Sequence, residues 1–219
     1  MATFLRILVW LGLLMFVLGI ILGGIVLLVI GLLLVIIAVA IASSPHGVLR
    51  SEQVVDMWAA LIEKANGKAN EVIDSLIGFL KESKAPSLQV VKKSIAPSWM
   101  KGVAGKNRDF LVITDKQSYR LEPYKIFANA RDYGENLDIA WYLTYRPTFG
   151  QVILSLFLGK SGFIPKGVGD LDIFDEQDLR AYATNAHMCM EKAVVKMMTA
   201  AGQDPKTIDW KSKGFLGVS

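Results

Sequence analysis

The chain has 219 residues, a formal net charge of +4 and a single cysteine, Cys189. The charge is too small to argue for nucleic acid as a partner, and a lone cysteine excludes an intrachain disulfide and a cysteine-built metal site. A length of this order allows one sizeable domain beside an apolar anchor.

An uncharged segment, Ile7–Ala42, dominates the beginning of the chain. Its 36 residues include no charged side chain and no Asn, Gln or Pro. Because about 20 helical residues span the hydrocarbon core of a membrane, one straight helix of this length would overshoot it. We therefore predict a transmembrane helical hairpin over residues 1–44, with the reversal at Gly23-Gly24. A single tilted span and a cleaved signal peptide are the alternatives.

Glycines recur in this segment at spacings of four and seven residues, which places small residues along one side of each helix. They are Gly12, Gly19, Gly23, Gly24 and Gly31. Small residues let helix axes approach closely, so we predict that these positions pack membrane helices. The contact lies either within the hairpin or between subunits, and the sequence does not decide between the two.

The flanks of the apolar segment predict its orientation. Arg6 and Arg50 lie on either side of it, whereas the turn between the predicted spans carries no charge. The positive-inside rule therefore predicts a multi-pass protein of the inner cell membrane with both termini in the cytoplasm. Residues 45–219 then form a cytoplasmic α+β domain.

Residues 51–84 have apolar side chains at helical spacing, and Ser51 suits the N-cap of a helix. We predict one long helix here, or two helices joined at Asn66-Gly67. The apolar stripe either packs on the sheet of its own domain or forms a coiled coil between subunits.

Short segments rich in Val, Ile, Phe and Tyr predict a mostly antiparallel sheet over residues 88–158. The segments are 88–91, 110–114, 118–121, 124–130 and 137–146, and turn signals such as Asp132-Tyr133-Gly134 separate them. Residues 152–158 are either a central strand or a short element at the membrane interface. A last helix over 175–202, with Asp175 as its N-cap and Gly202 at its end, completes a pair of long helices on one face of the sheet.

Basic residues predominate between Lys81 and Arg131, where eleven Lys or Arg stand against four Asp or Glu. On a tethered domain we expect this segment to contact the anionic membrane surface. The residues assigned to this contact are Lys92, Lys93, Trp99, Lys101, Lys106 and Arg108. A solvated basic face is the alternative.

No segment matches a catalytic or cofactor motif at the required spacing. Gly159-Lys160-Ser161 lacks the glycine that a phosphate-binding loop has five residues earlier, and residues 187–190 point in different directions on a helix. The acids between Asp170 and Asp178 suit the start of a helix better than a Ca²⁺ site. We therefore expect no enzymatic activity, no cofactor and no bound metal, with His187 and Cys189 in or beside the core.

These features together predict a membrane-anchored, oligomeric scaffold or accessory subunit that organises or recruits a protein complex at the cytoplasmic membrane face. Its expected partners are membrane lipids and either further copies of the chain or the subunits of a larger complex. The alternative is a lipid-binding or lipid-handling protein, which an apolar cavity of more than about 300 Å³ in the α+β domain would favour. A pore-forming oligomer is disfavoured, because the apolar segment has no polar side chains to line a pore.

Overall fold

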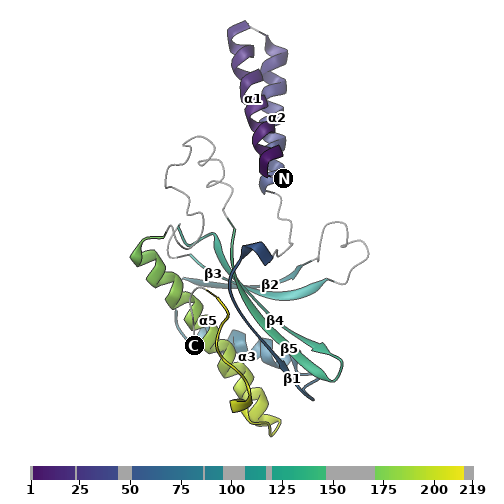
Figure 1. Cartoon of the computed structure of the whole chain (residues 1–219), viewed down its shortest axis with the longest axis vertical. Coiled ribbons are helices and arrows are strands. Elements are labelled where there is room, and N and C mark those ends of the chain that lie inside the picture. The colour runs from purple at the N-terminus through teal and green to yellow at the C-terminus, as the bar shows by residue number, and fades with distance from the viewer. Residues whose placement is uncertain are drawn as a thin grey trace. The chain divides into compact units, whose positions relative to one another are not determined.

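A computed structural model of the chain describes residues 2–22, 24–43, 51–85, 87–95, 107–116, 120–146 and 171–214. The chain divides into two compact units. The first contains helices α1 (Ala2–Leu22) and α2 (Ile25–Ser43). The second contains a five-stranded sheet with helices α3 (Ala69–Glu82) and α5 (Ile173–Ala200) (Figure 1).

Helices α1 and α2 lie side by side and run in opposite directions (Figure 1). Where the chain reverses, the N–H of Gly24 donates to the carbonyl oxygen of Gly19 at 3.0 Å. A Cβ atom on Gly31 would lie 2.6 Å from the carbonyl oxygen of Gly12 and 2.7 Å from the amide nitrogen of Phe16. The two helices therefore meet backbone to backbone, which only glycine permits at this point.

Within the described ranges, no helix combines the length and the hydropathy that crossing a membrane requires. This finding contradicts the predicted transmembrane hairpin, the membrane-anchored fold class and the multi-pass location in the inner membrane.

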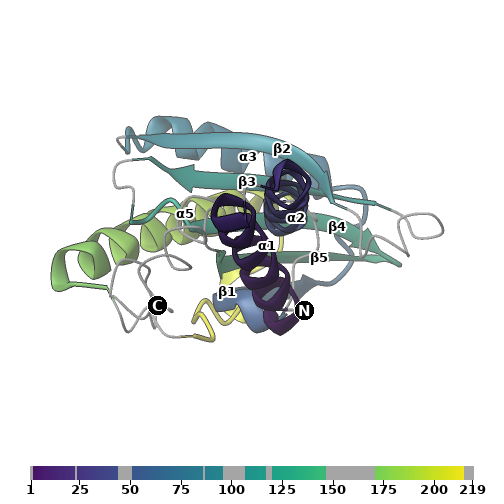
Figure 2. The same cartoon turned by 90° about the horizontal axis from the view of Figure 1, so that it is seen from above.

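The second unit is α+β, with an antiparallel sheet in the strand order β1-β5-β4-β3-β2. Its strands are β1 (Val54–Ile62), β2 (Leu88–Ile95), β3 (Arg108–Asp115), β4 (Tyr124–Tyr133) and β5 (Asn136–Tyr145). Strands β1 and β2 form the two edges, as Figure 2 shows from above. A two-residue turn at Gly134-Glu135 joins β4 to β5, and Gly134 has a φ of +63° there. The predicted α+β class with an antiparallel sheet is confirmed for this unit.

The predicted helix over residues 51–84 is wrong in its first half. The segment Val54–Ile62 is β1, which pairs with β5, and only α3 forms a helix farther along. Trp58 and Ile62 are four residues apart, a spacing that fits one face of a helix and equally one face of a strand. The segment forms a strand because it pairs with the edge of β5. Gly67, with a φ of +83°, lies in the turn that separates β1 from α3.

The structure also differs from the prediction in smaller details of the strands and of α5. The described part of the predicted strand 118–121 is a turn, and residues 152–158 lie outside the described residues. Asp172, not Asp175, caps α5, because its carboxylate accepts the N–H groups two and three residues farther on, at 3.0 and 2.9 Å. The end of α5 was predicted well, since Gly202 follows it with a φ of +71°.

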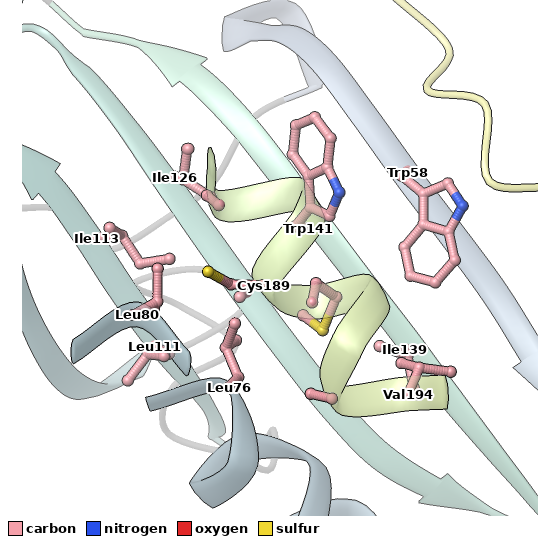
Figure 3. Close-up of a cluster of buried hydrophobic side chains, with 14 of the residues drawn as sticks. Trp58, Leu76, Leu80, Leu111, Ile113, Ile126, Ile139, Trp141, Cys189 and Val194 are labelled. Carbon is pink, nitrogen blue, oxygen red and sulfur yellow. The ribbon is translucent and has the colours of Figure 1, made fainter. Parts of the chain in front are cut away.

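Helices α3 and α5 cover the same face of the sheet and bury one continuous core (Figures 1 and 3). Figure 3 shows Cys189 of α5 among Leu80 of α3 and the strand residues Ile113 and Ile126. The apolar stripe of α5 is buried at Leu179, Ala183, Ala186, Met190, Ala193, Val194 and Met197. The stripe of α3, which consists of Val72, Leu76 and Leu80, is buried against the same core. The stripe of α3 therefore packs on the sheet of its own domain, which is the first of the two predicted alternatives.

An aromatic contact holds the C-terminal tail, residues 208–214, against β1. The Trp58 ring stacks on Trp210 with centroids 5.3 Å apart, and its Nε1–H donates to the carbonyl oxygen of Asp209 at 2.8 Å. Trp210 thus packs on the domain, and Phe215 lies outside the described residues.

The same tail covers the edge of β1. The N–H of Lys213 donates to the carbonyl oxygen of Met57 at 2.7 Å, and the hydroxyl of Ser212 donates to the buried carboxylate of Asp56 at 3.2 Å. The tail therefore makes contacts that protect one of the two sheet edges from pairing with another strand.

Candidate functional site

The sheet forks between β3 and β4. These strands pair over four residues each and separate beyond the pair Leu111–Ala128, although β2 stays paired with β3 and β5 with β4. Asn129 bridges the fork, because its side-chain N–H donates to the carbonyl oxygen of Asp109 at 2.5 Å. Beyond the fork, β3 and β4 no longer pair with each other.

A cleft of about 480 Å³ lies at this fork. Its volume is in the range of small-molecule binding sites. It is lined from α3 by Asn70 and Ile73, from β2 by Lys92, Lys93 and Ser94, from the start of β3 by residues 107–111, and from β4 by residues 129–131. The cleft thus gathers residues from four elements that are distant in sequence.

The lining is strongly basic. Its charged side chains are Lys92, Lys93, Arg108 and Arg131 against one carboxylate, Asp109. Lys92 forms an ion pair with Asp74 at 3.0 Å, and Arg131 forms one with Asp138 at 2.6 Å. These carboxylates neutralise Lys92 and Arg131, which leaves Lys93 and Arg108 beside Asp109 in the described lining.

Two cations of the lining, Lys93 and Arg108, form no ion pair with any residue that the structure describes. Burial lowers the pKa of Lys125 on strand β4, and the positive charge of Lys93 lowers it further. Lys93 therefore lies close enough to Lys125 to interact with it electrostatically.

The beginning of α3 borders the cleft. Asn70 lies in the first turn of this helix and lines the cleft. The side chain of the N-cap residue, Lys68, caps none of the backbone N–H groups of this turn and pairs instead with Glu71 of the same turn at 2.9 Å. The first N–H groups of a helix lack intrahelical partners, but the carboxylate of Glu71 offsets their partial positive charge.

The structure brings together only part of the predicted surface set. Lys92, Lys93 and Arg108 line one cleft, while Trp99, Lys101 and Lys106 lie outside the described residues. Contact of these residues with lipid headgroups is untested. The cleft also includes Asn70, Asn129 and Arg131, which the sequence analysis missed. The only available signal was the basic run itself, because the fork depends on strand register.

Three of the glycines predicted for helix packing lie at the contact between α1 and α2. Besides Gly12 and Gly31, a Cβ on Gly19 would lie 2.8 Å from the amide nitrogen of Leu28. Gly24 is less crowded, and Gly23 lies outside the described residues. Association between copies of the chain, for which outward-facing apolar side chains of the hairpin would be available, stays a prediction.

The chemically reactive residues singled out in the sequence are structural in this fold. His187 and Cys189 are buried, and burial raises the pKa of the Cys189 thiol. Asp172 and Asp175 both pair with Arg120 at the start of α5. In the described part of the chain, no group of three or more His, Cys, Asp or Glu side chains is placed to hold a metal ion. Residues 159–161 lie outside the described ranges.

In comparisons with known proteins, no family model, no curated protein and no solved structure matches this chain.

Proposed function

We propose that the chain is a non-enzymatic accessory or scaffold subunit that recruits an acidic protein segment, which extends the sheet as a new strand beside β2. The proposal rests on the difference between the two sheet edges. The tail covers β1 through Lys213, whereas no described strand pairs with the outer side of β2. An edge strand with free N–H and C=O groups is where a partner strand is commonly added.

The charged side chains of β2 indicate which kind of partner strand would pair with it. Lys92 and Lys93 are adjacent in this strand, and both are exposed. Successive side chains of a strand point to opposite faces, so one lysine lies on each face of the edge, and Lys92 is paired there with Asp74. Opposite charges on neighbouring strands stabilise their pairing, and like charges destabilise it. Glu or Asp side chains on the incoming strand therefore match this edge.

A second copy of β2 fits the same edge poorly. Two antiparallel β2 strands around a two-fold axis near Lys92 would place the lysines of one copy against those of the other. Like charges directly opposite each other destabilise a strand pair. This favours a different protein as the occupant of the edge.

The filled core argues against the lipid-handling alternative. Side chains occupy the space between the sheet and its two helices, and Leu76, Ile139 and Met190 among them are at most 1% exposed. An acyl chain would have to displace such close-packed groups, which costs several kcal/mol per large side chain by the usual magnitude of about 2–5 kcal/mol. Recruitment at the sheet edge requires no such rearrangement.

Binding of synthetic peptides to the full chain tests the proposal. The probe is a peptide of alternating Glu and Val or Thr, and its control has the same acidic residues but prolines at several of the other positions. We expect saturable binding of the first peptide only, because proline prevents strand pairing. The double variant Lys92→Gln with Lys93→Gln should weaken this binding by about tenfold or more.

Isothermal titration measures these affinities, and the variant Lys192→Gln with Lys211→Gln controls for a general loss of positive charge. Equal binding of the proline-containing peptide would show that the acidic charge alone is recognised, which would overturn strand addition. Absence of binding by either peptide would overturn recruitment at this edge altogether.

A further inference from the structure

The cleft at the sheet fork has a donor set that strand recruitment does not use. We propose that it binds an organic phosphate, a phosphate monoester about the size of a mononucleotide. This site is distinct from the backbone edge of β2, although Lys92 and Lys93 belong to both. The proposal therefore goes beyond the recruiting function and does not depend on it.

Charge is the first reason to assign a phosphate. Lys93 and Arg108 enter the cleft without an ion-pair partner among the described residues. A phosphate monoester carries close to two negative charges near neutral pH. Arg suits phosphate because its planar group donates two parallel hydrogen bonds, and Lys adds a compact charge. The two unpaired cations match the charge of the ligand.

The distribution of neutral donors is the second reason. The side-chain amides of Asn70 and Asn107 and the hydroxyl of Ser94 line the cleft. A carboxylate ligand offers two oxygens in one plane, whereas a phosphate offers three terminal oxygens in different directions. Donors that approach from α3, β2 and the start of β3 fit the second geometry better.

Size and apolar surface indicate the organic part. A volume of about 480 Å³ exceeds what one inorganic phosphate fills. The half-buried ring of Phe110 and the apolar side chains of Ile73 and Leu111 form part of the wall. Phe110 is held edge-on by Phe127, with ring centroids 6.3 Å apart, so its position is fixed. Asp109 is the one carboxylate of the lining, and it accepts hydrogen bonds from the hydroxyl groups of the organic part.

Titration of the full chain with small molecules tests this assignment. The probes are adenosine monophosphate, ribose 5-phosphate, inorganic phosphate and adenosine without phosphate. We expect saturable binding of adenosine monophosphate, at least tenfold tighter than that of inorganic phosphate or adenosine, because both halves of the ligand contribute. Arg108→Gln should weaken binding of adenosine monophosphate by at least tenfold, whereas Lys192→Gln, which removes an exposed lysine of α5, should change it less than twofold.

The competing outcomes are distinguishable. Equal affinity for inorganic phosphate and adenosine monophosphate would overturn the organic-phosphate assignment, and so would equal losses in Arg108→Gln and Lys192→Gln. Tighter binding of a single-stranded oligonucleotide than of the mononucleotide would replace the small ligand by a nucleic acid. Failure of every phosphate probe, with the acidic peptide still bound, would overturn this inference and leave the recruiting function intact.

Discussion

At the scale of single residues, Tyr182 connects α5 to the sheet through its hydroxyl group. The O–H donates to the carbonyl oxygen of Ile113 at 2.6 Å and accepts the N–H of Ile126 at 3.2 Å. Burial raises the pKa of Tyr182 far above its ordinary value, so the phenol keeps its proton at every physiological pH. One side chain thus satisfies a backbone donor and a backbone acceptor on two neighbouring strands.

Replacing this tyrosine tests the importance of that bridge. Tyr182→Phe should lower the free energy of unfolding by about 1–3 kcal/mol, because the buried N–H of Ile126 loses its acceptor. Urea denaturation of the full chain measures the change. Tyr133→Phe is the matched control, since Tyr133 is 62% exposed and should alter stability by less than about 0.5 kcal/mol. Equal small effects of both variants would contradict the bridge.

His187 is a buried residue whose protonation can change with pH. Its Nδ1 accepts the Nε1–H of Trp141 at 3.0 Å, and its ring contacts Trp58 edge to face. Burial lowers the pKa of His187, although the charges of Glu191 and Asp56 and the backbone of Trp210 act in the opposite direction. A protonated Nδ1 can no longer accept this hydrogen bond, so the neutral ring is the native form.

The lowered pKa gives the domain a defined pH dependence. Between the folded pKa of His187 and the unfolded value of 6.5, the unfolded chain binds the proton more readily. Stability is therefore fully present above the unfolded value, is lost as the pH falls through this window, and levels off below the folded pKa. Denaturant unfolding at about pH 7.5 and about pH 5.5 measures the loss.

The variant His187→Asn isolates this effect, because its side-chain oxygen can still accept from Trp141 but does not titrate. We expect a smaller difference in unfolding free energy between the two pH values than in the natural chain. An unchanged difference would assign the pH dependence to other groups.

At the scale of elements, the α1–α2 pair depends on contacts that only glycine allows. Gly31→Ala would place a methyl group 2.6 Å from the carbonyl oxygen of Gly12, so the helices must separate. At Gly24 a methyl group would meet only the Leu27 side chain, at 3.6 Å. We expect faster amide hydrogen exchange across α1 and α2 in Gly31→Ala and little change in Gly24→Ala. Similar exchange in the two variants would contradict close packing at Gly31.

The elements differ in how far sequence alone predicts them. Helix α5 was predicted within a few residues, because its apolar stripe repeats over seven turns and Gly202 marks its end, although the predicted N-cap was Asp175 and the observed one is Asp172. Strand β1 was missed, because nine residues that contain Trp58 and Ile62 fit both a helix and a strand. Only the pairing of β1 with β5, which is a non-local interaction, distinguishes the two. Local periodicity does not contain that information.

At the scale of the whole molecule, the candidate site was predicted only in part. The basic run identified Lys92, Lys93 and Arg108 as surface residues, but not as neighbours in one cleft. The cleft exists because β3 and β4 stop pairing after four residues, and neither Asn129 nor Arg131 stands out in the sequence. Register between strands sets this geometry, and it depends on the packing of the entire sheet on α3 and α5.

The tail that covers β1 also determines when the domain can be completed during synthesis. Asp209, Trp210 and Lys213 are among the last described residues of the chain, yet they contact Trp58 and Met57 near its start. Strand β1 is synthesised before these residues, so its edge stays open until the tail has emerged from the ribosome. This interval is when chaperones have most reason to bind the chain.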